Sequence, residues 1–532
     1  MTGSFEMSKT ALHRAFPVLN RRQLLAGAAG VSAAALLPVR AWAQDGRLNI
    51  RVYTEPDDFD PVDASGFGEA LLYGAIYRNL IQYESGDDWS YRLDLADSIE
   101  QTSDTTIEFT LKEGQMWSDG YGEITAEDVA FTFERILDPE MNSRIKPDVG
   151  PLARVEVTGR YSGVFHFDEA FAPFWWIALP YLAGTIVCKA AIEEAGGRIT
   201  TEVPPTVSGP YRVRELRPGE RWVLERNADY TGDNPADYER LDIVYIGDEA
   251  AAEIALEAGD LDFTEVSPGS VGRLQGNPPA GTAMSMHPSL FYVWVGMNME
   301  HPKFQDIRVR QALQYAINVN AIIEAAWYGV AEPSTGIIAP GLIGNRPESL
   351  IPPQGDPQRA RELLAEAGVE NLQVTLNVLN DVTFTTAAQV MQATMAQAGI
   401  ELNIEVHESG SFWTLGVEAD GDRWRDLEMI MNRFSMLPDP SYATAWFVTE
   451  QIGDWNWERF SDEEFDRLHR EARSETDDAR RDEMYRRAQD IMEESGAYRF
   501  ITHGVTPNLF HDSTAPGTRP DGLPLAQYFR RA

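Results

Sequence analysis

The chain has 532 residues, which is too many for one hydrophobic core and predicts two or three domains. Its 83 acidic and 45 basic residues give a net charge of −38, so nucleic acid is not expected as a partner, because phosphate binding needs a basic surface. Hydrophobic residues make up 43% of the chain, which is enough for a packed globular fold and argues against wholesale disorder.

The first 43 residues have the pattern of a cleaved export signal. Arg21 and Arg22 precede a mildly apolar stretch, residues 24–37, which is too short to span a bilayer. Ala41-Trp42-Ala43 is an A-x-A cleavage signal. We therefore expect cleavage after Ala43 and a soluble, periplasmic product.

The export route stays open. Paired arginines before a weakly apolar core resemble the signal of the twin-arginine route, but Asn20 and Leu24 depart from that pattern, so the Sec route is the alternative. Cys188 is the single cysteine of the chain, which excludes an internal disulfide. We expect it to be a small core residue.

The first half of the mature chain mixes strands and helices. Residues 48–54 are predicted to form a strand, and residues 105–112 a second one, because apolar side chains alternate along them. A helix is predicted over residues 124–137, where Thr125 and Asp128 have capping-box spacing.

A clearer α/β order begins near residue 306. The predicted elements are a helix over 306–329 with Asp306 as its N-cap, a helix over 357–368, a strand over 372–380, a helix over 384–399 and a strand over 401–408. The last three form a βαβ unit, which predicts a partly parallel sheet. Two charged helices are expected within residues 461–495, with Ser461 and Glu464 as a capping box, and the tail from about 505 is expected to return to the first domain.

Motifs of common catalytic and cofactor sites are missing from the sequence. There is no GxxxxGK[ST], no HExxH and no G-x-S-x-G. The eight histidines never pair at metal-ligand spacing, so we expect no metal site and no cofactor. In an exported α/β chain this favours a binding protein over an enzyme.

Four segments together carry a resemblance to a known family. They are "EPDDFDPVDAS" (55–65), "FTLKEGQMWSDGYGEITAEDV" (109–129), "SGPYRVRELRPGERWVLERNADYTG" (208–232) and "MNMEHPKFQDIRVRQALQYAIN" (297–318). In this order they resemble the family-5 extracytoplasmic solute-binding proteins, which are the dipeptide-, oligopeptide- and nickel-binding proteins of ABC transporters. The resemblance extends over nearly the whole mature chain.

The resemblance implies an α/β fold, the two-lobed periplasmic-binding-protein fold of class II and cluster C type, with an extra subdomain in the first lobe. The implied boundaries are a signal peptide over 1–43, a first lobe over 44–288, a second lobe over 289–503 and a C-terminal return to the first lobe over 504–532. A peptide or peptide-like solute is enclosed as the lobes close, and the partners are that solute and the permease subunits of the transporter. A monomer is expected.

The segment 208–232 is expected to be a scaffold hairpin in such a protein. Gly209-Pro210 and Pro218-Gly219 are turn signals, and the alternation between them suits two antiparallel strands with Trp222 and Leu224 facing a core. The alternative is that the arginines of this segment bind an anionic solute; they are Arg212, Arg214 and Arg217.

The candidate ligand contacts lie on irregular segments that follow strands, since loops between strands and helices often line binding sites. Aromatic and amide side chains of these segments form most of the predicted wall: Tyr53, Phe67, Phe412, Trp413, Phe434, Trp455, Asn456 and Trp457.

Three further candidates come from the resemblance. In peptide-binding relatives an Asp that pairs with the α-ammonium of the peptide stands a few residues before an Asp-Pro or Glu-Pro dipeptide. Matching on Asp439-Pro440 puts Met436 at that position and Arg433 at a nearby Trp position. Arg433 favours a carboxylate or another anionic group, and Asp439 could still supply a negative charge. This departure puts free dipeptides in doubt and leaves oligopeptides, opine-like conjugates, oligosaccharides and other small polar solutes.

Two other classes of function remain as alternatives. An exported hydrolase would need a nucleophile beside a base, and no such pair can be recognised. A nickel or haem receptor would need a ligand cluster, and His407 is the only histidine expected near the cleft.

Overall fold

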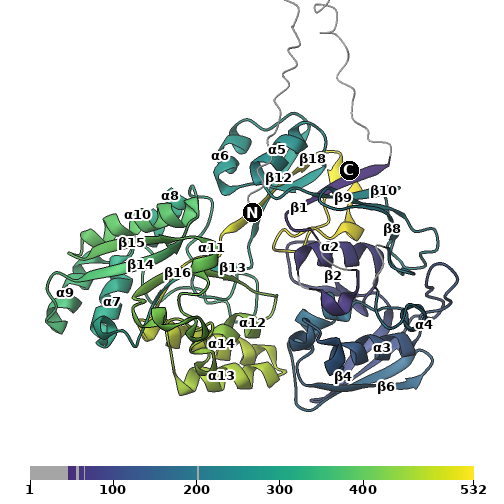
Figure 1. Cartoon of the computed structure of the whole chain (residues 1–532), viewed down its shortest axis with the longest axis horizontal. Coiled ribbons are helices and arrows are strands. Elements are labelled where there is room, and N and C mark those ends of the chain that lie inside the picture. The colour runs from purple at the N-terminus through teal and green to yellow at the C-terminus, as the bar shows by residue number, and fades with distance from the viewer. Residues whose placement is uncertain (1–45, 56–58, 65, 200–202) are drawn as a thin grey trace, which may run out of the picture. The chain divides into compact units, whose positions relative to one another are not determined.

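The computed structural model describes residues 46–55, 59–64, 66–199 and 203–532 (Figure 1). The predicted signal peptide and its cleavage site lie outside the described residues. Within those residues, no helix combines the length and the apolar character needed to cross a membrane.

In the described part of the chain, seven strands form one mixed sheet. Their order is β12 (Thr282–Pro288), β18 (Val505–His511), β11 (Phe263–Glu265), β1 (Arg47–Val52), β10 (Arg240–Tyr245), β9 (Arg221–Arg226) and β8 (Tyr211–Arg217). Strand β1 pairs in parallel with β10 and β11, and the other pairs are antiparallel. Figure 1 shows purple, teal and yellow strands in this sheet, because it joins early, middle and late segments of the described chain.

Both faces of the seven-stranded sheet are covered. The helix α2 (Phe67–Ile76) packs with the core that contains Ile50, Leu241 and Trp222. The helices α5 (Glu249–Glu257) and α6 (Pro268–Gly276) contribute to a smaller core with Val244 and Leu509.

The predicted hairpin is confirmed. Strands β8 and β9 pair antiparallel around Gly219, whose φ of 74° suits glycine. Trp222 and Leu224 are buried in the core as expected. Gly209 lies so close to helix α2 that a Cβ would be 2.6 Å from the carbonyl oxygen of Ala75, which explains a glycine at this turn.

The three arginines of the hairpin have acidic partners on the surface. Ion pairs join Arg212 to Asp119 (3.0 Å), Arg214 to Glu225 (3.6 Å) and Arg217 to Glu215 (2.8 Å). This arrangement fits the scaffold interpretation, because each guanidinium is already neutralised.

A two-stranded and a four-stranded sheet follow α2 in the chain. Strands β2 (Ile81–Tyr83) and β3 (Tyr91–Leu93) pair, and a four-stranded sheet follows in the order β4 (Ala96–Ser103), β5 (Thr106–Leu111), β7 (Ser162–Phe167) and β6 (Leu152–Gly159). Helix α3 (Ala126–Leu137) packs on it, and its predicted capping box is confirmed, since the backbone N–H of Thr125 donates to the Asp128 carboxylate at 2.9 Å. The short helix α4 (Lys189–Glu194) lies beside α3.

A five-stranded sheet is built from the middle of the chain. Its order is β15 (Glu401–His407), β14 (Gln373–Leu379), β16 (Met429–Ser435), β13 (Phe291–Met297) and β17 (Tyr498–Thr502). Strands β14 and β15 are parallel and joined by α10 (Val382–Ala396), so the predicted βαβ unit is confirmed.

Helices cover both faces of the five-stranded sheet (Figure 1). On one face α7 (Ile307–Ala316), α8 (Val319–Ala326), α9 (Pro357–Ala367) and α10 form a single core with the sheet. On the other face α13 (Glu463–Ser474) and α14 (Asp478–Glu494) pack with α12 (Pro440–Thr444). The helix α11 (Ser409–Phe412) belongs to a small satellite core.

Two helix predictions were wrong in detail. The helix expected over 306–329 is interrupted at Ile317, because the Asn318 side chain accepts the backbone N–H of Ala321 at 2.9 Å and starts a second helix. The N-cap of α13 is Asp462 rather than Ser461, and its carboxylate accepts the N–H of Phe465 at 2.9 Å.

Among the described residues the chain passes between the two larger sheets twice. It runs from β12 into β13 through Ser289 and Leu290, and from β17 into β18 through His503 and Gly504. The imidazole Nδ1 of His503 lies 3.0 Å from the carbonyl oxygen of Phe291, so the two crossings are neighbours. Short strands β19 (Thr514–Ala515) and β20 (Arg530–Arg531) close the C-terminal segment.

Candidate functional site

Tyr53 and Phe67 lie beyond the carboxyl end of β1, and their rings stack at 5.5 Å with an interplanar angle of 15°. Strands β1, β10 and β11 are parallel, so their carboxyl ends share one edge, where open α/β sheets commonly bind ligands. Tyr53 is 38% exposed and Phe67 is partly exposed, so each ring is accessible on part of its surface only.

Charged groups from both larger sheets act on Tyr53. Burial and the carboxylate of Glu265 raise the pKa of Tyr53 to about 12, and Arg433 opposes them. Arg433 belongs to β16 of the five-stranded sheet, so this edge of the seven-stranded sheet lies within electrostatic reach of that arginine.

Arg433 is an exposed cation held by aromatic rings. Its guanidinium lies 5.4 Å from the centre of the Phe291 ring and 5.9 Å from that of Phe384. Among the described residues, no carboxylate forms an ion pair with Arg433. The charge is therefore available to an anionic group of a solute.

Four partly exposed aromatic residues, on the opposite face of β16 from the Arg433 side chain, form what we call the aromatic wall: Phe434, Tyr442, Trp446 and Trp455. The ring centres of Phe434 lie 5.8 Å from those of both Trp446 and Trp455, and Tyr442 lies 5.9 Å from Trp446. Phe434 and Trp455 were predicted. Tyr442 and Trp446 were not among the predicted contacts, although their spacing of four residues on a short helical segment would place both rings on one side.

Asp439 is a structural residue instead of an exposed charge. It is fully buried, and its carboxylate pairs with the guanidinium of Arg481 at 2.8 Å. The same carboxylate caps α12 by accepting the N–H of Ser441 at 2.9 Å. Both oxygens are therefore committed to the fold.

Other predicted contacts are also buried. The Asn456 side chain donates to the carbonyls of Phe447 (3.1 Å) and Phe460 (2.8 Å), which ties its loop together. Met436 is 3% exposed and belongs to the core beneath the aromatic wall.

A separate satellite core holds the remaining candidates. Phe412 and Trp457 are 1% and 2% exposed, and their ring centres are 5.9 Å apart. Trp413 is partly exposed but packs against both rings. The structure thus brings Tyr53 together with Phe67, and Phe434 together with Trp455, while Arg433 lies on the other face of β16 beside Phe291 and Phe384. It packs Phe412, Met436, Asp439, Asn456 and Trp457 into the interior.

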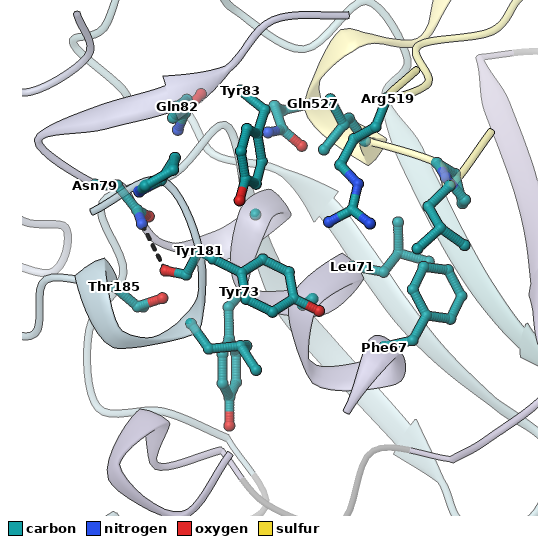
Figure 2. A pocket seen from close by; sticks show the side chains of 17 residues that line it. Phe67, Leu71, Tyr73, Asn79, Gln82, Tyr83, Tyr181, Thr185, Arg519 and Gln527 are labelled. Atoms are coloured by element: carbon teal, nitrogen blue, oxygen red, sulfur yellow. Dashed lines mark hydrogen bonds between the residues drawn. The ribbon is translucent and has the colours of Figure 1, made fainter. Parts of the chain in front are cut away.

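A small cavity lies beside Phe67 (Figure 2). Its volume is about 50 Å³, which holds a few waters and is far below the several hundred Å³ of an ordinary ligand pocket. Figure 2 shows the Arg519 guanidinium beside the Tyr181 ring, with 5.6 Å between guanidinium and ring centre. Arg519 is buried and paired with Asp521.

Metal-ligating residues do not cluster in the described residues: no group of three or more His, Cys, Asp or Glu side chains could hold a metal ion. His407, the candidate for a nickel site, has its Nε2 atom 2.7 Å from the amide oxygen of Asn377.

Comparisons with known proteins agree on one family. The family described as "Bacterial extracellular solute-binding proteins, family 5 Middle" matches residues 90–455. The chain is 26% identical over 517 residues to Di/tripeptide-binding protein 3 of Pseudomonas aeruginosa (strain UCBPP-PA14), which covers 88% of this chain and 94% of that protein.

Solved structures share the fold. The ABC transporter substrate-binding protein CtaP of Listeria monocytogenes matches with a TM-score of 0.79 at 21% identity, covering 91% of this chain and 99% of that one. The solute-binding protein MoaA of A. tumefaciens R10, in complex with mannopinic acid, matches with a TM-score of 0.70 at 23% identity, covering 92% and 99%. The fold is the two-lobed periplasmic-binding-protein fold. The chain belongs to family 5 of the bacterial extracellular solute-binding proteins.

Proposed function

We propose that this chain captures a peptide or peptide-like polar solute between two hinged lobes and delivers it to the permease of an ABC importer. The first lobe comprises residues 44–288 and 504–532, and the second comprises residues 289–503. The support is that each part has its own sheet and core, and that the described chain crosses between the sheets at two neighbouring places. Two adjacent crossings suit a hinge, because a few residues there can absorb the change in backbone angles.

The proposed contacts come from both lobes. Tyr53 and Phe67 form an aromatic platform on the first lobe, and the candidates from the second lobe are Arg433, which acts electrostatically on Tyr53, and the aromatic wall on the other face of β16. Accessible rings with a few polar or charged groups are the usual composition of a site that encloses a small organic solute.

The observation that carries the proposal is the family match over residues 90–455. Relatives named for di- and tripeptides favour a peptide as the solute. We infer export to the periplasm with cleavage after Ala43, a monomer that binds without chemical turnover, and no cofactor.

The test is to identify the solute that the purified protein retains. Denaturing the mature protein and analysing the released small molecules by mass spectrometry should give a peptide or a related polar solute. Adding that solute back should raise the melting temperature with its concentration, because a ligand that binds only the folded state stabilises it. Small-angle scattering should show a smaller radius of gyration with the solute. A protein that binds no peptide and no related solute would refute the proposal.

A second candidate solute is an opine-like conjugate that carries several anionic or hydroxyl groups. Arg433 favours it, since this exposed cation forms no ion pair with the described residues. MoaA, a relative in fold, is known in complex with mannopinic acid. Calorimetric titration with mannopinic acid and with tri-alanine would separate the two solutes.

A further inference from the structure

The last turn of α13, in the second lobe, is bound by a loop of the first lobe. Helix α13 ends at Ser474, so carbonyl oxygens of its last turn need partners outside the regular helix. The Nε atom of Arg481 donates to the carbonyl oxygen of Ala472 at 2.9 Å, which is a bond within the second lobe. The backbone N–H of Ala172, in the first lobe, donates to the carbonyl oxygen of Arg473 at 2.9 Å. The other lobe therefore completes this helix end.

The side chain of Arg473 reaches the same loop. Its guanidinium lies 5.3 Å from the centre of the Phe171 ring. Within the part of the chain that the structure describes, no carboxylate forms an ion pair with Arg473. A guanidinium near an aromatic face is attracted by the negative charge of that face. The backbone and the side chain of Arg473 thus both contact one dipeptide of the first lobe, Phe171-Ala172.

The Phe171 ring is held in place by the first lobe itself. It is 7% exposed and belongs to the main core of that lobe. Gly150, whose φ is 56°, lies so close that a Cβ there would be 2.6 Å from the ring. The loop is also closed by a hydrogen bond from the backbone N–H of Asp168 to the carbonyl oxygen of Pro151 at 3.0 Å. The ring is therefore a preformed surface for the guanidinium.

Trp89 makes a second contact between the lobes. It lies on the turn between β2 and β3 and packs against the core beneath the aromatic wall. A Cβ on Gly341 of the second lobe would lie 3.8 Å from the indole ring. The first lobe fixes the position of this indole, because the guanidinium of Arg519 and the ring of Tyr83 lie 5.5 and 5.6 Å from its centre.

Both contacts consist only of groups of the protein, so they can form without a solute. They share no residue with the two chain crossings at 289–290 and 503–504, or with the predicted solute contacts. One neutral hydrogen bond, one cation–ring contact and one apolar contact are individually weak. Weak contacts suit a reversible closure, because a solute that prefers the closed form can then shift the balance.

We propose that the contacts of Arg473 with Phe171 and Ala172 form a latch that holds part of the solute-free molecules closed. Trp89 supports the latch at the second contact. The affinity for the solute is the intrinsic affinity of the closed form multiplied by the closed fraction, so the latch sets the affinity without touching the solute. Arg473 is then a positioning residue. This inference rests on the two hinged lobes of the proposed function and adds what controls their closure.

The size of the effect follows from the contact that a substitution removes. Arg473→Ala deletes the cation–ring contact and keeps the backbone hydrogen bond. A partly exposed contact of this kind changes an equilibrium constant about two- to fivefold, so the closing constant should fall by that factor. The solute affinity should fall by up to the same factor, through faster dissociation, because the solute leaves when the lobes open.

The experiment combines small-angle scattering of the mature protein with calorimetry and dissociation kinetics for tri-alanine. Without solute, Arg473→Ala should have a larger radius of gyration than the parent. With saturating tri-alanine the two radii should agree, while the variant binds up to about fivefold more weakly and releases the peptide faster. Arg473→Lys keeps a cation and should retain part of the parent behaviour.

Arg467→Ala is the matched control. It removes the same charge from the same helix, but Arg467 pairs with Glu471 of that helix at 2.7 Å, so this variant should behave like the parent. Phe171→Leu keeps an apolar side chain and removes the aromatic face, so it should resemble Arg473→Ala. The double variant should be no more open than either single variant, because both remove one contact.

The radius of the solute-free protein decides the proposal. An Arg473→Ala protein with the radius of the parent overturns the latch, and so does an equal increase of the radius in Arg467→Ala. A larger radius together with parent-like affinity overturns the coupling to solute binding. Failure of the parent to bind tri-alanine counts against peptide capture instead, and the latch is then still decided by scattering alone.

Discussion

Asp439 was a candidate solute contact, but its contacts in the fold indicate a structural role. Its replacement should therefore reduce the stability of the protein without changing its affinity for the solute. Its carboxylate is fully buried, 2.8 Å from the guanidinium of Arg481, whose side chain is 2% exposed. Asp439→Asn keeps an oxygen that can cap α12 but removes the charge, which leaves the guanidinium buried without a counter-ion. Removing one member of a buried ion pair costs about 3–5 kcal/mol. Asp439→Ala also removes the cap, for about 1 kcal/mol more.

The measurement is unfolding by the denaturant guanidinium chloride, followed by tryptophan fluorescence. The solute affinity of the folded variant is measured by calorimetry. The double variant Asp439→Asn, Arg481→Met should recover part of the lost stability, because no unpaired charge then remains in the interior. The reasoning is refuted if Asp439→Asn unfolds at the denaturant concentration of the parent and yet loses its solute.

Three further outcomes are expected. Arg433→Ala should weaken binding of a solute with an anionic group by about 2–4 kcal/mol in calorimetry, because the enclosed anion loses its partner; parent-like affinity would place the anion elsewhere. As the pH rises from 4.5 to 8, Glu458→Gln should become about 3 kcal/mol more stable to unfolding relative to the parent. Burial raises the folded-state pKa of Glu458 from 4.5 to about 7, so the parent loses this stability as the pH rises through 7, whereas the variant does not. Denaturant unfolding at both pH values checks this, and a constant difference in stability would contradict it. Changing Arg21 and Arg22 to Lys should leave the precursor in the cytoplasm on cell fractionation if the twin-arginine route is used, whereas unchanged export would indicate the Sec route.

Local patterns predicted the parts of the fold that depend on neighbours in the chain. The hairpin of β8 and β9 follows from its turn residues and alternation, and the capping box of α3 spans only Thr125 to Asp128. The break at Asn318 was not predicted, because asparagine is tolerated inside helices as well as at their ends, and the choice here depends on packing.

The site was less predictable because burial decides which side chains reach a solute. Asp439 and its partner Arg481 are far apart in the chain, so their pairing is invisible in the sequence. Trp455 and Trp457 lie in one loop, yet the first is partly exposed and the second is buried.

The place of β18 has a consequence for the order in which the chain can fold during synthesis. This strand lies between β12 and β11, both of which leave the ribosome long before it. Until β18 arrives, each of those strands has an open edge where the finished sheet has a neighbour, and such edges are sites of wrong pairing. Strands β13, β14, β15 and β16 meet no such delay, since they pair with one another before β17 adds at one side. The second half of the molecule can therefore become ordered first, and a chain that stops short of residue 505 would carry an incomplete first sheet however well its middle has folded.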